Sequence, residues 1–194
     1  MNHGKPAGIL YDARLVASLL DLPFPEHESR SLGSPPSSAP GTYTLFDPGL
    51  SLVDLFQRSV VRRSRLMFFQ EWYREYDWAV QQAAPGYRQL RVPVPKSFDL
   101  SYYRQAELLH PGEAAAKVRT VATLLVVHYV MSGQSLLHDR SKEQWVRCAE
   151  QVEGGHRVKV GRFGGGGFEV QYTLDCISEA GDGLAAERTL GTSA

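Results

Sequence analysis

The feature that most constrains the fold of this chain is the apolar run from Glu113 to Gly133. Its apolar residues lie on nearly all sides of a helix rather than along one stripe, which indicates a helix that is buried on most of its surface. An acidic residue and three alanines begin the run, and a glycine suited to a C-cap ends it. The sequence therefore predicts a central core helix, although the frequent β-branched residues leave a strand as the alternative.

The charge-free part of this run, Thr120 to Gly133, is too short to span a membrane. It has 14 residues, whereas a helix needs about 20 to cross a bilayer. Asp12, Arg14 and Asp21 interrupt the first apolar stretch of the chain, which argues against a signal peptide. Two cysteines are too few for a disulfide framework. We therefore expect a soluble cytoplasmic protein that has reduced thiols and no membrane association.

The charge balance argues against a dedicated nucleic-acid binder. The 194 residues include 21 basic and 21 acidic residues, so the formal net charge is zero. Nucleic-acid-binding domains carry a basic excess instead. A net charge near zero also favours self-association, so we expect a homo-oligomer or a protein partner.

Composition divides the chain into three parts. Residues 1–22 contain a short predicted helix, and residues 23–49 are rich in proline, serine and glycine. The second part is expected to be a flexible linker. A proline-rich ligand for a partner domain is the alternative, but the linker has no PxxP motif with a flanking basic residue. Residues 50–194 are expected to fold as a single globular domain.

The segment from Leu50 to Ala84 is predicted to form a long helix. Ser51 and Asp54 have the spacing of a capping box at its start. The apolar stripe drifts round the helix near Ser64, where a bend or break is expected. A Pro-Gly pair ends the segment.

Two surfaces of this predicted helix are candidate binding sites. Its second half holds more aromatic side chains than one core face takes, so Trp72 and Tyr76 are predicted to contact a partner. Arg58, Arg62 and Arg65 have the spacing of one helical face, where their guanidinium groups suit an anionic partner. A solvated charged face is the commoner outcome for such a pattern.

Alternating residues predict a β-sheet in the second half of the chain. Three alternating stretches between Gln144 and Thr173 predict an antiparallel meander with one apolar and one polar face. Tyr87 to Pro95 also alternates, and its prolines predict an edge strand. Short helices are expected over residues 97–109 and 183–190. The predicted fold class is α+β: an antiparallel sheet, made of the meander plus the edge strand, covered by the buried central helix and the long aromatic helix.

A run of glycines separates the last two predicted strands: Gly164, Gly165, Gly166 and Gly167. Glycines let backbone amides converge on a phosphate or a carboxylate. A phosphate-binding loop, however, needs a GK[ST] sequence that leads into a helix, and this run leads into a strand. A hairpin turn is therefore favoured over an anion- or peptide-binding loop.

Three residues are candidates for acid–base catalysis. His138 and Asp139 follow the central helix, and His128 lies within it. Neighbours in an extended chain point apart, and a histidine in an apolar helix is more often a satisfied core residue, so non-catalytic roles are favoured. The chain has no HExxH, CxxC or GxSxG motif, and we therefore predict no metal and no cofactor.

These observations lead to three hypotheses about function. The first is a non-enzymatic binding or regulatory module that uses the aromatic and Arg-rich segment. The second is a small enzyme that has a pocket between the central helix and the sheet and uses His, Asp and Arg side chains. The third is nucleic-acid or anion binding through Arg58 to Arg65, together with Arg157 and Lys159.

Overall fold

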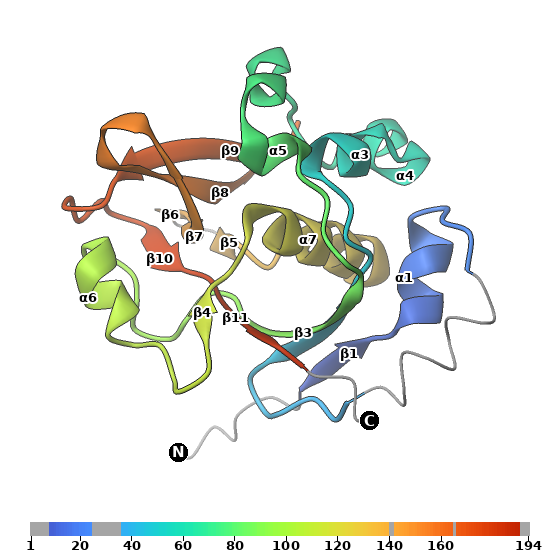
Figure 1. Cartoon of the computed structure of the whole chain (residues 1–194), viewed down its shortest axis with the longest axis horizontal. Coiled ribbons are helices and arrows are strands. Elements are labelled where there is room, and N and C mark those ends of the chain that lie inside the picture. Colours follow the sequence, from blue (N-terminus) through green and yellow to red (C-terminus); the bar gives the residue numbers. More distant parts are fainter. Residues whose placement is uncertain (1–7, 25–35, 140–141, 165, 191–194) are drawn as a thin grey trace.

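The computed structural model describes residues 8–24, 36–139, 142–164 and 166–190 of the chain. Figure 1 shows helix α7 (Val118–Ser132) near the centre of the molecule, with β-strands and shorter helices around it. The strands form two main sheets and one short two-stranded pair. This mixture of helices and sheets confirms the α+β class.

The first sheet has five strands. In spatial order they are β1 (Ile9–Tyr11), β2 (Tyr43–Asp47), β3 (Gly86–Arg91), β11 (Ala186–Thr189) and β4 (Ala114–Ala115). β1 and β2 are parallel, and the other neighbours are antiparallel. The position predicted for residues 87–95, at the edge of the meander's sheet, is wrong, because β3 is the middle strand of this separate sheet. The strand ends at Arg91, so Pro93 and Pro95 lie beyond it and remove no hydrogen bond from the sheet.

The second sheet contains the predicted meander. Strands β7 (Trp145–Val152), β8 (His156–Gly164) and β9 (Gly167–Leu174) are antiparallel neighbours, and a short 3-10 turn, η2 (Glu153–Gly155), joins the first two. Strand β10 (Asp182–Leu184) adds to the meander in parallel with β7. The remaining pair, β5 (His138–Asp139) and β6 (Lys142–Glu143), is antiparallel.

The helix predicted over residues 183–190 is wrong, because this segment supplies β10 to one sheet and β11 to the other. Leu184, Ala185 and Ala186 are buried there. Sheet edges on both sides provide hydrogen-bond partners for the backbone, and this tertiary pairing overrides the helix propensity of alanine.

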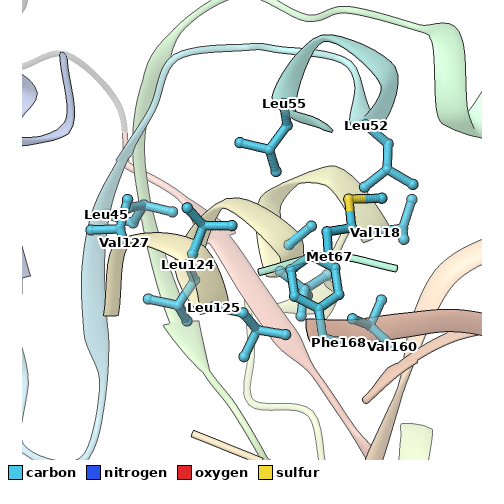
Figure 2. Close-up of a cluster of buried hydrophobic side chains, with 14 of the residues drawn as sticks. Leu45, Leu52, Leu55, Met67, Val118, Leu124, Leu125, Val127, Val160 and Phe168 are labelled. Atoms are coloured by element: carbon cyan, nitrogen blue, oxygen red, sulfur yellow. The ribbon is translucent and has the colours of Figure 1, made fainter. Parts of the chain in front are cut away.

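The central helix is confirmed, but it begins later than the apolar run. Ala114 and Ala115 form β4 and pair with β11, so the helix starts at Val118. Gly133 caps its C-terminus in the left-handed conformation, with a φ of 69°. The helix contacts strands of both main sheets and helices on other sides. Figure 2 shows Val127 beside Leu45 of β2 in this core.

The break expected near Ser64 is confirmed, because a helix ends at Arg63, but the rest of the segment is not one long aromatic helix. The segment divides into α3 (Leu52–Gln57), α4 (Ser59–Arg63), η1 (Glu71–Glu75) and α5 (Asp77–Val80). Met67, between α4 and η1, forms a parallel bridge to Phe168, and Figure 2 shows the two side chains together. In a continuous helix, at about 100° per residue, Met67 would point roughly 120° away from the side shared by Leu55 and Tyr73, whereas the broken segment buries all three. The capping box is confirmed, because Ser51 Oγ accepts a hydrogen bond from the Asp54 amide at 3.0 Å.

The described part of residues 1–49 contributes to the same core. The short helix predicted in residues 1–22 is confirmed as α1 (Ala13–Leu19), which is capped by Asp12 and packs in the main hydrophobic cluster. Within the predicted linker, residues 25–35 lie outside the described residues, whereas Tyr43–Asp47 form β2. Across the described ranges, no helix combines the length and apolar character that crossing a membrane requires.

Candidate ligand-binding cleft

An open cleft of about 1060 Å³ lies where three distant parts of the chain meet. Residues 75–83, which include α5, form one wall. The N-terminal end of α7 contributes Lys117 and Arg119. The end of β7, the η2 turn and the facing part of β8 and β9 contribute the rest. The cleft therefore depends on tertiary packing and has no counterpart in a local sequence motif.

Aromatic rings form one side of this cleft. Tyr76 and Trp78 are stacked, with ring centroids 5.7 Å apart, and Tyr172 completes the lining. Trp72 packs edge-on against Tyr172, with centroids 5.9 Å apart, and also contacts Tyr76 and Trp78. Tyr172 is 45% exposed and Trp78 only 8%. The cluster thus joins a fixed buried ring to a ring that a ligand can reach.

A buried tyrosine fixes this aromatic segment to the sheet. The Tyr73 hydroxyl donates a hydrogen bond to the Val170 carbonyl in β9 at 2.7 Å. Burial raises the pKa of Tyr73 to about 12, so its hydroxyl keeps its proton near neutral pH. The Tyr73 side chain is fully buried and touches the rings of Phe69, Trp72 and Trp78. Tyr73 therefore fixes residues 71–78 against the meander.

Glu150 lies where α7 begins. Its carboxylate accepts a hydrogen bond from the Val118 amide at 2.9 Å, so it satisfies a donor that the first turn of the helix leaves free. Burial raises the pKa of Glu150, although this hydrogen bond and nearby Lys117 act in the opposite direction. The carboxylate is thus already used to start the helix.

Arg119 is also already paired. Its guanidinium donates to Asp47 at 2.8 Å, and the Thr120 hydroxyl donates to the same carboxylate oxygen at 3.0 Å. Asp47 is completely buried, and its other oxygen accepts from the Gly49 amide at 2.8 Å. Asp47 therefore largely neutralises the positive charge of Arg119.

Three acidic side chains on the walls are exposed: Glu75, Asp77 and Glu153. Among the described residues, none of the three forms an ion pair. His156 lies beside them, its Nδ1 3.2 Å from the Glu153 carbonyl and its ring 5.7 Å from that of Tyr172. The cleft thus combines a histidine, free carboxylates and aromatic rings.

The structure brings some of the predicted binding residues together. Tyr76 lines the cleft, and Trp72 packs against its aromatic wall. Sequence reasoning missed Asp77, Glu150 and His156. The η2 turn was recognisable from its glycines, but no local signal shows that α5 packs over it.

The arginine face does not form as predicted. Arg58 lies in an extended conformation between α3 and α4, and Arg65 follows the end of α4 with a φ of 48°. Arg62 is in the last turn of α4. The helical spacing fails because no single helix contains all three residues. Anion binding by the individual arginines stays a hypothesis.

Arg157 and Lys159 are occupied by ion pairs. Arg157 binds Asp175 through two hydrogen bonds of 2.8 and 3.0 Å. Lys159 pairs with Asp182 at 3.2 Å and with Glu179 at 2.7 Å. Both basic side chains are buried, so their charged groups bind acidic residues of the protein and do not lie on the surface where a nucleic acid would contact them.

The catalytic candidates lie in two other places. The Tyr11 hydroxyl and His128 Nδ1 are 2.6 Å apart, and the ring of Tyr43 lies 5.8 Å from the His128 ring. Burial lowers the pKa of His128. His138 and Asp139 form β5, and the structure describes only their backbone. A catalytic role for these residues stays a hypothesis.

The glycine run joins the hairpin of β8 and β9, in which Gly164 pairs with Gly167. Gly167 has a φ of 93°, and a Cβ atom there would lie 2.1 Å from the Leu66 carbonyl carbon. This close approach lets residues 66–68 pair with Phe168. Gly165 lies outside the described residues, and binding by the loop stays a hypothesis. Within the described ranges, no group of three or more His, Cys, Asp or Glu side chains is arranged to hold a metal ion.

Comparisons with protein-family models, with curated proteins and with solved structures find no match to this chain. Its function is therefore inferred from the cleft.

Proposed function

We propose that this protein is a non-enzymatic binding module that recognises a segment of a partner protein in the cleft between α5 and the meander. One observation carries the proposal: an open cleft of about 1060 Å³ combines an accessible aromatic wall with charged side chains. Concave sites of this size and mixed lining are where proteins bind ligands. Tyrosine and tryptophan are also enriched at protein interfaces, because each offers a large apolar ring and a polar group.

An exposed ring in the cleft, and exposed apolar residues at both ends of the segment that forms its aromatic wall, favour a protein partner over a small enclosed ligand. Val80, at the end of α5, is 43% exposed, and Phe68, which precedes η1, is 48% exposed. They flank, in the sequence, the segment that forms the aromatic wall, and the 45% exposed ring of Tyr172 lines the cleft itself. Apolar residues that gather beside polar groups on a surface are typical of protein contact sites.

An enzyme that uses the same cleft is the second candidate. The observation that favours it is a carboxyl group with a raised pKa, Glu150, in a cleft that also contains His156, Asp77 and Arg119. Two contacts weigh against it. The Glu150 carboxylate binds the first amide of α7, and Arg119 is paired with Asp47. Both groups therefore stabilise the fold, and this role explains their positions.

Selection from a library of short random peptides tests the proposed function. The wild-type protein is expected to enrich a common sequence motif, whereas a Tyr172→Ala variant is expected to lose it. Tyr103→Ala is the matched control, because Tyr103 is 65% exposed and lies on α6 (Tyr102–Ala106), outside the cleft lining. Circular dichroism would verify that both variants fold. The proposal fails if no motif is enriched, or if Tyr172→Ala enriches the same motif as the wild type.

A further inference from the structure

We propose that the group which anchors the partner in the cleft is a cation, the side chain of an arginine or lysine in a flexible segment of the partner protein. This inference rests on the proposed function and adds the chemistry of recognition to it. It follows from three observations: the balance of unpaired charge in the cleft, an aromatic ring that a ligand can reach, and the apolar surface that the cleft exposes.

The first observation is an excess of free negative charge. Glu75 and Asp77 lie on the α5 side and Glu153 on the opposite η2 side, so carboxylates face the cleft from two directions. Glu150 and Arg119 are already bonded within the protein. Lys117 is the remaining cation of the lining, and its charge acts on nearby Glu150. A cationic ligand would therefore gain from three unpaired carboxylates, whereas an anionic ligand would be repelled.

The second observation concerns the rings. Arginine and lysine bind favourably over aromatic faces when the charge lies within about 6 Å of the ring centre. This protein uses that contact elsewhere, since Arg157 lies 3.5 Å over the Tyr102 ring and Arg74 lies 5.3 Å over the Phe69 ring. In the described part of the chain, no cation of the protein lies over the rings of Tyr76 or Tyr172. Tyr172, which is 45% exposed, presents a ring that a cation from a ligand can reach, whereas one face of Tyr76 is stacked against Trp78.

The third observation identifies the source of the cation. The open cleft exposes the apolar ring surface of Tyr172 and part of that of Tyr76, which a free polyamine would leave largely uncovered. A peptide that carries a basic residue can place its charge between the carboxylates and cover these apolar groups with its neighbouring residues. The arrangement therefore favours a basic peptide segment over a small free amine.

Fluorescence anisotropy with labelled Gly/Ser peptides tests the inference. The peptides would be identical except for one central residue: arginine, lysine, glutamine, glutamate or citrulline, which has the shape of arginine without its charge. We expect the arginine and lysine peptides to bind roughly tenfold more tightly than the citrulline and glutamine peptides, because contact with an exposed ring and attraction to the carboxylates each add a few-fold. Binding should weaken as salt is raised.

Variants locate the effect in the cleft. Asp77→Asn and Glu153→Gln are each expected to weaken arginine-peptide binding about two- to five-fold, as befits the loss of one exposed charge. Glu107→Gln is the matched control, because Glu107 is equally acidic, is exposed at the end of α6 and lies outside the lining. It should leave binding unchanged.

Several outcomes would overturn the inference. Equal binding of the arginine and citrulline peptides, or tighter binding of the glutamate peptide, excludes recognition of a cation. Carboxylate variants that bind as well as the wild type place the site elsewhere. Spermidine that binds as tightly as the arginine peptide assigns the cleft to free polyamines instead. If the random library yields a motif without arginine or lysine, the proposed binding function stands and the inferred recognition of a cation is wrong. If the library yields no motif, both proposals are wrong.

Discussion

At the scale of single residues, the molecule depends on charges that are buried and paired. Arg147 is completely buried, and its guanidinium donates to the carbonyls of Leu100 at 2.9 Å and Ile177 at 2.7 Å. It also lies 3.4 Å from the carboxylate of Asp182, which is 1% exposed. These contacts join strand β7 to loops that are distant in sequence.

Arg147→Met should therefore destabilise the protein strongly. The substitution leaves Asp182 with less positive charge and two carbonyls without donors, so we expect a loss of about 3–5 kcal/mol in the free energy of unfolding. Urea denaturation would measure it. Arg104→Met is the control, because Arg104 forms an exposed pair with Glu107 at 3.2 Å that should contribute only about 0–1 kcal/mol. A loss below about 1 kcal/mol for Arg147→Met would contradict this account.

Glu150 provides a prediction that depends on pH. Its carboxyl has a raised pKa because it is buried, so the folded protein holds this proton more tightly than the unfolded chain does. The charge consequently costs stability at neutral pH, and wild-type stability recovers as the pH falls through the raised pKa. Glu150→Gln keeps an acceptor for the Val118 amide without the charge, and should be at least as stable as the wild type at pH 7.

Thermal unfolding over a pH series measures this effect. The advantage of Glu150→Gln should shrink as the solution is acidified, because the wild-type carboxyl becomes neutral as well. Glu150→Leu is the comparison that removes the acceptor, and it should lose about 1–3 kcal/mol because the Val118 amide stays unsatisfied. A Glu150→Gln variant that is much less stable at neutral pH and no different in acid would refute the assignment.

At the scale of secondary-structure elements, the sequence predicted the helices and strands whose signals lie within their own segments. Helices α1 and α7 and the meander β7–β8–β9 were found because their periodicity, caps and turns lie within each segment. Strands β2, β10 and β11 were missed because their partners are far away in the sequence. The long aromatic helix was wrong for the same reason: Met67 pairs with Phe168, and that contact interrupts the segment.

The hairpin between β8 and β9 makes this pairing testable. Gly167→Ala would place a methyl group 2.1 Å from a carbonyl carbon of Leu66, at a φ of 93° that alanine rarely adopts. We expect a loss of about 2–4 kcal/mol from backbone strain and overpacking together. Gly166→Ala is the matched control, since its new methyl would meet only the Phe68 ring at 3.7 Å. Equal chemical-denaturation midpoints for the two variants would contradict the close approach of the two segments.

At the scale of the whole molecule, both faces of the meander pack against other parts of the chain. The apolar face packs on α7, as the alternation predicted. On the polar face, Arg157 binds Asp175 and lies over Tyr102 of α6. An alternating pattern identifies a polar face but does not show whether solvent or a paired loop lies against it. The cleft was unpredictable for a related reason, because residues near 77, 117 and 153 meet only in the folded chain.

The segment that contains β10 and β11 holds the two main sheets together, because it provides one strand to each. A chain that ends after Gly181 would lack both strands and the buried side chains of Leu184, Ala185 and Ala186. We expect this truncated chain to lose cooperative unfolding, measured by circular dichroism during heating, while the full chain keeps it. Cooperative unfolding near the wild-type temperature would show that the segment is dispensable.

The central claim is that the cleft between α5 and the meander is the binding site. Nuclear magnetic resonance titration of nitrogen-15-labelled protein with the arginine peptide tests it most directly, because each backbone amide reports its own environment. We predict that the largest shifts occur at Asp77, Lys117, Glu153 and Tyr172, with little change at Arg62 or Tyr103. Shifts that centre on Arg62 and its neighbours, or spectra that do not change at all, would contradict the account.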